Sequence, residues 1–456
     1  MNTICAISTP YGSGGIAVIR VSGTDAISLV DKLFRGRKQL TEAAAYTVHY
    51  GEISKPTPTP SLKGKDIDEQ EVLDQVLVSV FRAPHSFTGE DVVEIACHGS
   101  LYIQQTLLQW LVDVGCQMAK AGEFTQRAFL NGKMDLTKAE AVADLIAAQT
   151  KAEKDLALSQ LRGGISKELA SLRERLLTFT SLVELELDFA DHEELEFADR
   201  SQLNELAQEI ENKISKLVGS FKIGNAIKQG IPVAIIGAPN VGKSTLLNAL
   251  LGEERAIVSD IQGTTRDTIE DTLVLGGMLF RFIDTAGMRQ TEDTIENLGI
   301  ERSRQAAQRA TIIIHLQDAT QPNDTLSFVS ELEQKTIIEV YNKADLQPSF
   351  ETPENAILIS AKNCEIDTLE QRLVSFATKQ YSTQNSVTIS NTRHYESLSR
   401  ALAAIQRVQD GLLAQISGEF LSMDLQDCLE ALGEITGQIT SQEVLNNIFG
   451  KFCIGK

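Results

Sequence analysis

Short apolar runs rich in β-branched residues open the chain. Within residues 1–120 these runs are TICAI, GIAVIRVSG, QVLVSVF and VVEIACHG, and glycines and prolines separate them. Runs of this length that end in turn-forming residues are typical of β-strands. We therefore predict an α+β domain over residues 1–120.

Helical spacing of apolar positions replaces these runs after Glu123, in segments such as AEAVADLIAAQTKAEKDLALSQL, and it returns after Val387 in RHYESLSRALAAIQRVQDGLL. Between the two, from about Gly230, β-branched runs such as VAIIG and TIIIHL alternate with helical segments, which is typical of a parallel α/β domain. The prediction is a multidomain chain. An all-α helical domain is formed from two sequence halves, residues 121–220 and 381–456, and an α/β domain is inserted between them at residues 221–380.

Composition narrows the functions that such a chain can have. It has 456 residues, with 42 Lys and Arg against 62 Asp and Glu, and a formal net charge of −20. A protein that grips nucleic acid over a broad surface needs clustered basic residues, so we expect any nucleic-acid contact to be local. The six cysteines have neither C-x-x-C nor metal-ligand spacing, and no apolar window is long enough to cross a membrane. A cytoplasmic protein without a membrane segment is expected.

A nucleotide-binding motif stands at the start of the α/β domain. Residues 237–244, GAPNVGKS, fit the pattern G-x-x-x-x-G-K-[ST], follow the apolar run VAIIG and precede the helical run STLLNALL. In this motif the backbone N–H groups of the loop point at phosphates, Lys243 meets the β- and γ-phosphate charge, and the Ser244 hydroxyl binds Mg²⁺. The inserted domain is therefore predicted to be a P-loop nucleotide-binding domain.

Three later motifs identify the nucleotide. DTAG at 284–287, NKAD at 342–345 and SAK at 360–362 each follow a predicted strand, where ligands of such sheets bind. The Asp345 carboxylate can accept two hydrogens from guanine that adenine cannot supply, so we predict a GTPase with Thr265 as a second Mg²⁺ ligand beside Ser244. The predicted GTP-binding residues are Asn240, Val241, Gly242, Lys243, Ser244, Thr245, Ser259, Thr264, Thr265, Asp284, Thr285, Ala286, Gly287, Asn342, Lys343, Asp345, Ser360, Ala361 and Lys362.

Two positions bear on how the attacking water is oriented and how the phosphate charge is neutralised during GTP hydrolysis. Met288 stands where a water-orienting glutamine is found in related GTPases, so the attacking water must be oriented from elsewhere. Acidic candidates follow at Glu292, Asp293 and Glu296. Asn240, inside the phosphate loop, could coordinate a monovalent cation or could simply be a turn residue, and the residues alone leave both interpretations open.

With this GTPase between helical halves and FCIGK at the end of the chain, the sequence resembles the tRNA-modification GTPase family called MnmE or TrmE. The segments GGIAVIRVSG, SFTGEDVVEIACHG and GEFTQRAFLNGKMDLTKAEAVADLI carry the resemblance too, which covers essentially the whole chain. It implies an enzyme that works with an FAD-dependent partner, MnmG, on carbon 5 of the wobble uridine in certain tRNAs. The added group would be aminomethyl or carboxymethylaminomethyl. A tetrahydrofolate, in the 5-formyl or methylene form, would supply its one-carbon unit.

The same resemblance implies site residues and assembly. The N-terminal domain would bind folate and form a homodimer, and the dimer would join MnmG in a heterotetramer-type complex. Glu296 would orient water once two G domains meet, K⁺ would replace an arginine finger, and the thiol of Cys453 would be needed for modification as a nucleophile or a binding group. The implied folate-binding residues are Arg20, Glu94, Lys133 and Lys456, the implied K⁺ ligands are Asn240, Ser259, Ile261 and Thr264, and the catalytic residues are Glu296, Lys243 and Cys453.

Two alternatives remain open. One is a GTP-dependent RNA-binding switch of the ribosome-assembly type, which performs no covalent chemistry. Such proteins usually carry a basic RNA-binding module, whereas the flanks here are acidic. In the other, the N-terminal domain is a stand-alone aminomethyltransferase and the G domain only a scaffold. His98 has the look of a ligand but no second metal-type residue at suitable spacing, so a structural role is favoured for it.

Overall fold

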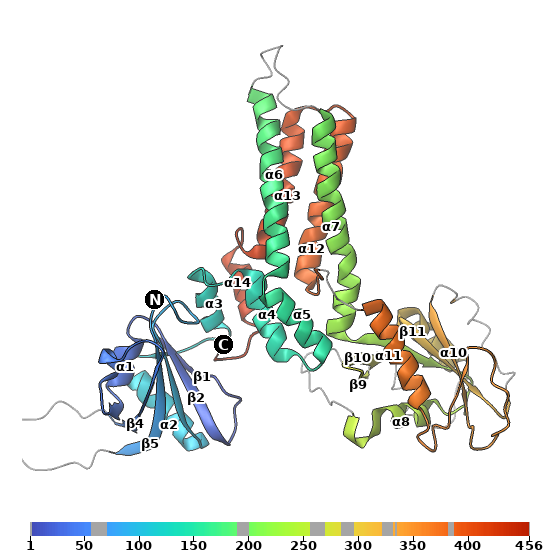
Figure 1. Ribbon diagram of the computed structural model, residues 1–456, viewed down its shortest axis with the longest axis horizontal. Coiled ribbons are helices and arrows are strands. Elements are labelled where there is room, and N and C mark those ends of the chain that lie inside the picture. Colours follow the sequence, from blue (N-terminus) through green and yellow to red (C-terminus); the bar gives the residue numbers. More distant parts are fainter. Residues whose placement is uncertain are drawn as a thin grey trace, which may run out of the picture. The chain divides into compact units, whose positions relative to one another are not determined.

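The computed structural model describes residues 2–55, 71–188, 200–255, 270–283, 296–321, 332, 335–381 and 387–455 (Figure 1). The chain forms two compact units, one from Met1–Ala143 with Gly433–Lys456 and one from Asp144–Leu432. The first unit thus combines the two ends of the chain. The four domain ranges predicted from the sequence divide the chain more finely than these units, and they stay predictions.

A seven-stranded sheet in the order β3-β4-β5-β6-β2-β1-β7 is the centre of the first unit. All neighbouring strands are antiparallel except β1 and β7, which are parallel. Alternate residues of β2, such as Ile19 and Val21, are buried on one face, where Val30 of α1 and Leu111 of α2 complete the core. The elements are β1 (Ile4–Ile7), β2 (Gly14–Ser22), α1 (Ala26–Asp31), β3 (Phe34–Gly36), the 3₁₀ turn η1 (Leu40–Glu42), β4 (Thr47–Ser54), β5 (Val72–Phe81), β6 (Val92–Gly99), α2 (Leu101–Asp113) and β7 (Gln117–Met118).

Helices near both ends of the chain complete this unit. They are α3 (Glu123–Leu130), α4 (Leu136–Ala147) and α14 (Gln442–Phe449). On the sheet face opposite α1 and α2, Phe124 of α3 packs with Ile4 and Ala6 of β1. Leu136 of α4 shares a small apolar cluster with Phe449 of α14. The C-terminal segment is therefore held by apolar contacts to residues that lie more than 300 positions earlier in the sequence.

Long helices make up much of the second unit, and Figure 1 shows them running side by side. The residues of α12 that are buried recur at helical spacing, as in Leu398, Ala401, Ile405 and Val408, because one face of the helix packs against its neighbours. The long helices are α6 (Gly164–Asp188), α7 (Arg200–Gln229), α12 (Thr392–Leu413) and α13 (Gly418–Thr436), and the shorter α5 (Lys151–Leu161) precedes α6.

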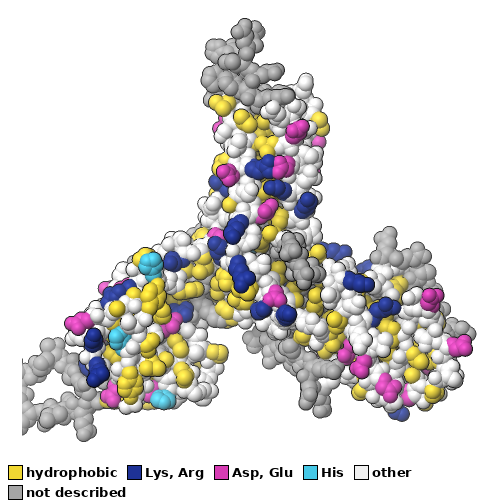
Figure 2. Space-filling view, in the orientation of Figure 1, with side chains coloured by type: hydrophobic (Ala, Val, Ile, Leu, Met, Phe, Trp, Pro, Cys, Tyr) yellow, Lys and Arg dark blue, Asp and Glu magenta, His cyan; other side chains and the backbone are white. Residues whose placement is uncertain are grey.

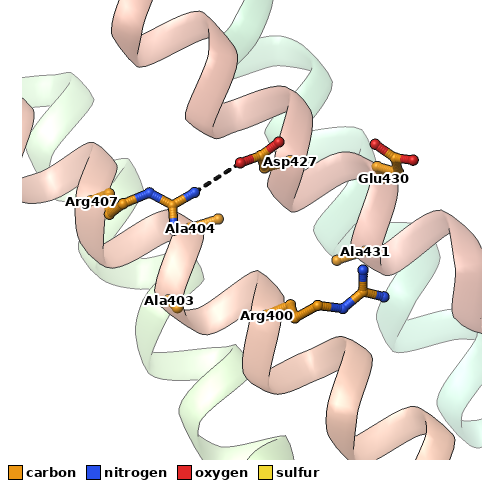
Figure 3. Close-up of a pocket in the computed structure, with 7 residues that line it drawn as sticks. All are labelled: Arg400, Ala403, Ala404, Arg407, Asp427, Glu430 and Ala431. Carbon is orange, nitrogen blue, oxygen red and sulfur yellow. Dashed lines mark hydrogen bonds and ion pairs between the residues drawn. The ribbon is translucent and has the colours of Figure 1, made fainter.

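A groove of about 300 Å³ lies between α12 and α13 (Figure 3). Arg407 of α12 crosses it and donates to Asp424 at 2.6 Å and to Asp427 at 2.9 Å. Because the Arg407 side chain is half exposed, these ion pairs contribute little stability, about 0–1 kcal/mol each. The lining residues are Arg400, Ala403, Ala404, Arg407, Asp427, Glu430 and Ala431.

The same unit contains a six-stranded sheet in the order β13-β12-β11-β8-β10-β9. Only β9 and β10 pair antiparallel, so the sheet is of the parallel α/β type that the alternating pattern predicts. Its central strands are buried on both faces: Ile314 faces the cluster that includes α11, and Ile313 faces α10. The elements are β8 (Ile231–Ile236), α8 (Lys243–Arg255), β9 (Asp271–Leu275), β10 (Met278–Phe282), α10 (Glu296–Arg309), β11 (Ile312–Asp318), β12 (Thr336–Asn342), β13 (Ile357–Leu358) and α11 (Asp367–Tyr381).

Charge is mixed on the surface. On the face in Figure 2, Lys and Arg side chains are interspersed with Asp and Glu and do not gather into one broad basic area. A search of the described helices finds none that is long and apolar enough to cross a membrane.

Candidate functional site

The phosphate loop connects the end of β8 to the start of α8. Its two outer glycines stand where other parts of the sheet come very close. A Cβ on Gly237 would overlap the backbone oxygen of Leu316, and a Cβ on Gly242, which has φ 99°, would overlap the side-chain nitrogen of Asn342. Glycine is needed at both positions because a side chain would displace the loop from the strands beside it.

Lys243 is the first residue of α8, and its ammonium group turns back into the loop. It donates to the backbone oxygens of Gly237 and Ala238, at 2.8 Å each. Burial lowers the pKa of this ammonium group below its ordinary value. A cation and the free N–H groups of a helix N-terminus thus converge on one loop, an arrangement that can bind a phosphate chain.

Asn342 connects this loop to a second one. Its carboxamide nitrogen donates to the backbone oxygen of Val241 at 2.8 Å, and its carboxamide oxygen accepts from the backbone N–H of Ala361 at 3.0 Å. The residue is only 3% exposed. One buried side chain therefore fixes the phosphate loop, the end of β12 and the loop after β13 relative to one another.

The neighbours of Asn342 are held by a second set of contacts. Lys343 donates to the Asp318 carboxylate at 2.5 Å, and Ser360 donates to the Asp345 carboxylate at 2.9 Å. Burial raises the pKa of Asp318, but hydrogen bonds from Lys343 and Thr320 outweigh it and hold the pKa below its usual value. The predicted guanine-recognising carboxylate of Asp345 thus has a fixed orientation.

A second polar cluster lies on the sheet of the first unit, on the face that carries Phe124. The Nε and Nη2 atoms of Arg20 both donate to Oε1 of Glu94, at 3.0 and 2.8 Å. The guanidinium carbon lies 5.3 Å from the ring centre of Phe87 and 5.7 Å from that of Phe124. Both charged side chains remain partly exposed. The cluster offers a carboxylate, a cation and two aromatic rings to a planar ligand.

The C-terminal tail packs onto the same unit. The backbone oxygen of Cys453 accepts from Gly122, and the Ser8 hydroxyl donates to the backbone oxygen of Gly455 at 3.2 Å. Gly455 has φ 93°, and a Cβ there would overlap the backbone oxygen of Ile7 at the end of β1. The Cys453 thiol is exposed. The tail is therefore fixed by its backbone, and its thiol is left accessible.

Comparison with known proteins gives full-length matches. Residues 3–133 match the family described as "GTP-binding protein TrmE N-terminus", and residues 136–453 match "MnmE helical domain". The protein named tRNA modification GTPase MnmE from Parabacteroides distasonis is 54% identical, and the alignment covers 100% of both chains. The chain belongs to the MnmE family of tRNA modification GTPases. The MnmE of Flavobacterium johnsoniae is 49% identical over 100% of this chain and 99% of its own.

A solved structure of a different protein also matches. It is the G domain of the T. maritima FeoB iron transporter, 22% identical, with a TM-score of 0.25, which covers 32% of this chain and 98% of its own. At that score the similarity supports no conclusion about this MnmE family member. The chain is a GTP-binding GTPase that takes part in tRNA modification, as its family membership states.

Several residues predicted for the MnmE site lie outside the described part of the chain. Glu296 begins α10, but only its backbone is described. Two other predicted residues are described. Asn240 is exposed in the phosphate loop with φ 63°, and Lys133 donates to the backbone oxygen of Pro84 at 2.8 Å. The predicted residues that the structure leaves undescribed are Ser259, Ile261, Thr264, Thr265, Asp284, Thr285, Ala286, Gly287, Met288, Glu292, Asp293 and Lys456.

Two polar contacts near the sites were missed in the sequence. Asp318 follows the run TIIIHL at the carboxyl end of β11, and the rule that placed Asn342 at a strand end would have found it. Arg127 of α3 is 5% exposed and donates to the carboxylates of Glu90 and Glu123. Glu123 and Arg127 have the i, i+4 spacing of a helical ion pair, but no local pattern indicates that Arg127 is buried or that Glu90, from a separate segment, joins the pair.

His98 has a structural partner in this MnmE chain. Its Nδ1 atom and its backbone N–H both contact the Asp74 carboxylate, at 2.7 Å each, and its side chain is 70% exposed. Among the residues that the structure describes, no group of three or more His, Cys, Asp or Glu could hold a metal ion.

Proposed function

We propose that this protein is a K⁺-dependent GTPase that acts with an FAD-dependent MnmG partner on carbon 5 of the wobble uridine in certain tRNAs. The reaction adds an aminomethyl or carboxymethylaminomethyl group. The observation that carries the proposal is the Arg20–Glu94 pair between two aromatic rings, on a domain that matches the TrmE N-terminus. A ribosome-assembly switch would have no use for a small-molecule site of this chemistry.

The residues present fit a tetrahydrofolate. A pterin ring is planar and carries N–H groups in a row, which a carboxylate such as Glu94 accepts, and aromatic rings such as Phe87 cover flat ligands. Arg20, Lys133 and Lys456 supply cations for its glutamate carboxylates. A bound 5-formyl- or methylene-tetrahydrofolate would supply the one-carbon unit. The exposed Cys453 thiol acts in this unit, as a nucleophile or a binding group.

The G domain residues fit the proposed ions. Ser244 follows Lys243 in the first turn of α8, where its hydroxyl is proposed to bind Mg²⁺, and Thr265 is the proposed second ligand. The exposed carboxamide of Asn240 offers an oxygen for K⁺, with Ser259, Ile261 and Thr264 as the other ligands. Glu296 orients the attacking water when two G domains of a homodimer meet.

The proposed partners follow from charge as well as family. The protein has a net charge of −20, and the face in Figure 2 has no broad basic area. A tRNA would therefore be held largely by MnmG, in a heterotetramer-type complex of the cytoplasm.

The decisive experiment is nucleoside analysis of tRNA from cells that lack this protein, with and without plasmid-borne variants. Loss of the modified wobble uridine, restored by the wild-type gene and not by Glu94→Gln, supports the proposal. Glu94→Gln keeps the shape of the side chain and removes its charge, and its GTPase rate is the control that the protein is folded. An unchanged nucleoside profile in the deletion strain would replace the proposal with the RNA-binding switch.

The ion and the glutamate are tested separately. GTP hydrolysis is measured in K⁺ and in Na⁺ at equal ionic strength, and equal rates would refute K⁺ dependence. Glu296→Ala should lose hydrolysis by about 10²-fold or more while it still binds GTP, since water orientation acts on the chemical step. Full hydrolysis by this variant would refute the role of Glu296.

A further inference from the structure

The turn between β9 and β10 consists of two glycines in the left-handed region. Gly276 has φ 57° and Gly277 has φ 78°, and the register pairs Leu275 with Met278 across the turn. This is the two-residue hairpin turn that glycine pairs favour. This turn also contacts two helices of the second unit, α5 and α11.

One contact is made by α5. The backbone N–H of Ala152 donates to the backbone oxygen of Gly277 at 3.2 Å. Ala152 lies in the first turn of α5, where N–H groups have no partner inside the helix, and Thr150 caps a neighbouring one, that of Glu153. The hairpin carbonyl therefore acts as a second cap of α5.

The other contact is made by α11. A Cβ on Gly276 would overlap Cγ1 of Val374, so the turn and this side chain are already at closest approach. Leu275 of β9 and Leu156 of α5 belong to one apolar cluster, against which Val374 and Met278 also pack. The turn is thus clamped between α5 and α11, and the clamp is continuous with the core of the domain.

The clamp sits at one end of a strand whose other end leads to the predicted catalytic region. β10 pairs in parallel with β8, Phe280 with Ile231 and Phe282 with Val233. After β10, Ile283 donates to the backbone oxygen of Val233 at 2.9 Å, and the next residue in the sequence is Asp284. β8 itself ends at the phosphate loop.

We propose that the clamp formed by Gly276, Gly277, Ala152 and Val374 positions β10 for GTP hydrolysis, and that it does so without contributing to nucleotide affinity. β10 is a short rigid strand of about 16 Å at about 3.3 Å per residue, so a shift at the turn is carried to its far end. A displacement of about 1 Å in a reacting geometry costs up to about 100-fold in rate. The groups that bind the nucleotide are fixed separately, by Asn342 and by the phosphate loop.

The experiment uses the full-length protein and a double-mutant cycle. Gly276→Ala introduces a methyl group against Val374, Val374→Ala removes the methyl groups that it would meet, and the double variant combines the two. We expect Gly276→Ala to lower kcat for GTP by about 10-fold with the Kd for a fluorescent GDP within about twofold of wild type. The double variant should recover kcat to within about threefold.

A matched control separates the clamp from the cost of alanine in the left-handed region. Gly132 has φ 68°, a Cβ added to it would have no other atom within 4 Å, and it lies in the first unit, so Gly132→Ala should leave kcat unchanged. An unchanged kcat in Gly276→Ala, a Kd that rises as much as kcat falls, or no recovery in the double variant would each overturn the proposal.

If Gly276→Ala does not fold, Val374→Ala alone decides. It opens the clamp without backbone strain and should lower kcat by about threefold at unchanged Kd. A wild-type kcat in a folded Val374→Ala protein would overturn the proposal as well.

Discussion

Asn342→Ala should disconnect the phosphate loop from the loop after β13. The substitution removes a donor to Val241 and an acceptor for Ala361, at 2.8 and 3.0 Å. Both backbone partners lie in residues that are about 3% exposed or less, so water does not easily replace the lost contacts. Both polar groups of the carboxamide are therefore used: its nitrogen donates to the phosphate loop, and its oxygen accepts from the loop after β13.

The size of the effect follows from these two contacts. A buried polar group that loses its partner costs about 1–3 kcal/mol, and two of them, partly relieved by relaxation, cost about 2–4 kcal/mol in the conformation that binds nucleotide. At about 1.4 kcal/mol per factor of ten, the Kd for GDP should rise between about 30-fold and nearly 1,000-fold.

The assay is titration of the full-length protein with a fluorescent GDP, beside thermal unfolding followed by circular dichroism. Asn363→Ala is the control, because Asn363 is exposed and its backbone N–H, which the substitution keeps, makes its contact to Ser360. It should change the Kd by less than about twofold. If Asn342→Ala lowered the unfolding temperature but left the Kd within threefold of wild type, Asn342 would be a stabilising residue and not one that positions the loops.

Three further substitutions test other parts of the structure. Arg127→Ala leaves the carboxylate of Glu90, whose side chain is only 12% exposed, without its cation and should lower the free energy of unfolding by about 3 kcal/mol, measured by urea denaturation of the full chain. Because the Asp318 pKa is held below its usual value, its ion pair stabilises the protein above about pH 4 and that contribution is lost as the pH falls through the lowered pKa. Asp318→Asn should therefore destabilise the protein at neutral pH, and its difference from wild type in the same assay should shrink as the pH falls below about 4 towards the lowered pKa. Gly455→Ala should displace the tail from Ile7 and abolish tRNA modification in cells, with GTP hydrolysis unchanged.

The strand, loop and helix around the phosphate loop could be predicted because their pattern is local in the sequence, whereas the contacts of single residues to the nucleotide stay predictions. The octet that ends in Ser244 carries its own turn, cation and hydroxyl, and a strand before it and a helix after it are visible as apolar runs. Asn342 and Asp345 were found by the same strand-end rule. What the sequence could not show is that Asn342 acts as a connector: its two partners, Val241 and Ala361, are known only once three strands lie side by side.

Contacts between distant segments were the part that could not be predicted. Arg127 is one of many charged residues on a helical pattern, and only the fold shows that it is buried between two carboxylates. The glycine pair that begins at Gly276 indicates a turn, but nothing in the sequence indicates that Ala152 and Val374 contact it. Pairing of this kind depends on the order of strands and helices in space, which short motifs do not encode.

The tail that rests on β1 has a consequence for biosynthesis. The first unit contains Met1–Ala143 and Gly433–Lys456, so its last segment leaves the ribosome only after residues 144–432 have been made. At about 5–20 residues per second, that interval is about 15–60 s. During that interval the strand that ends at Ile7 lacks its contact with Gly455, while the intervening segment can already fold. Closure of Gly455 against Ile7 can therefore occur only after residues 144–432 have been made, and a chain terminated within that segment would have an N-terminal unit that lacks Gly433–Lys456.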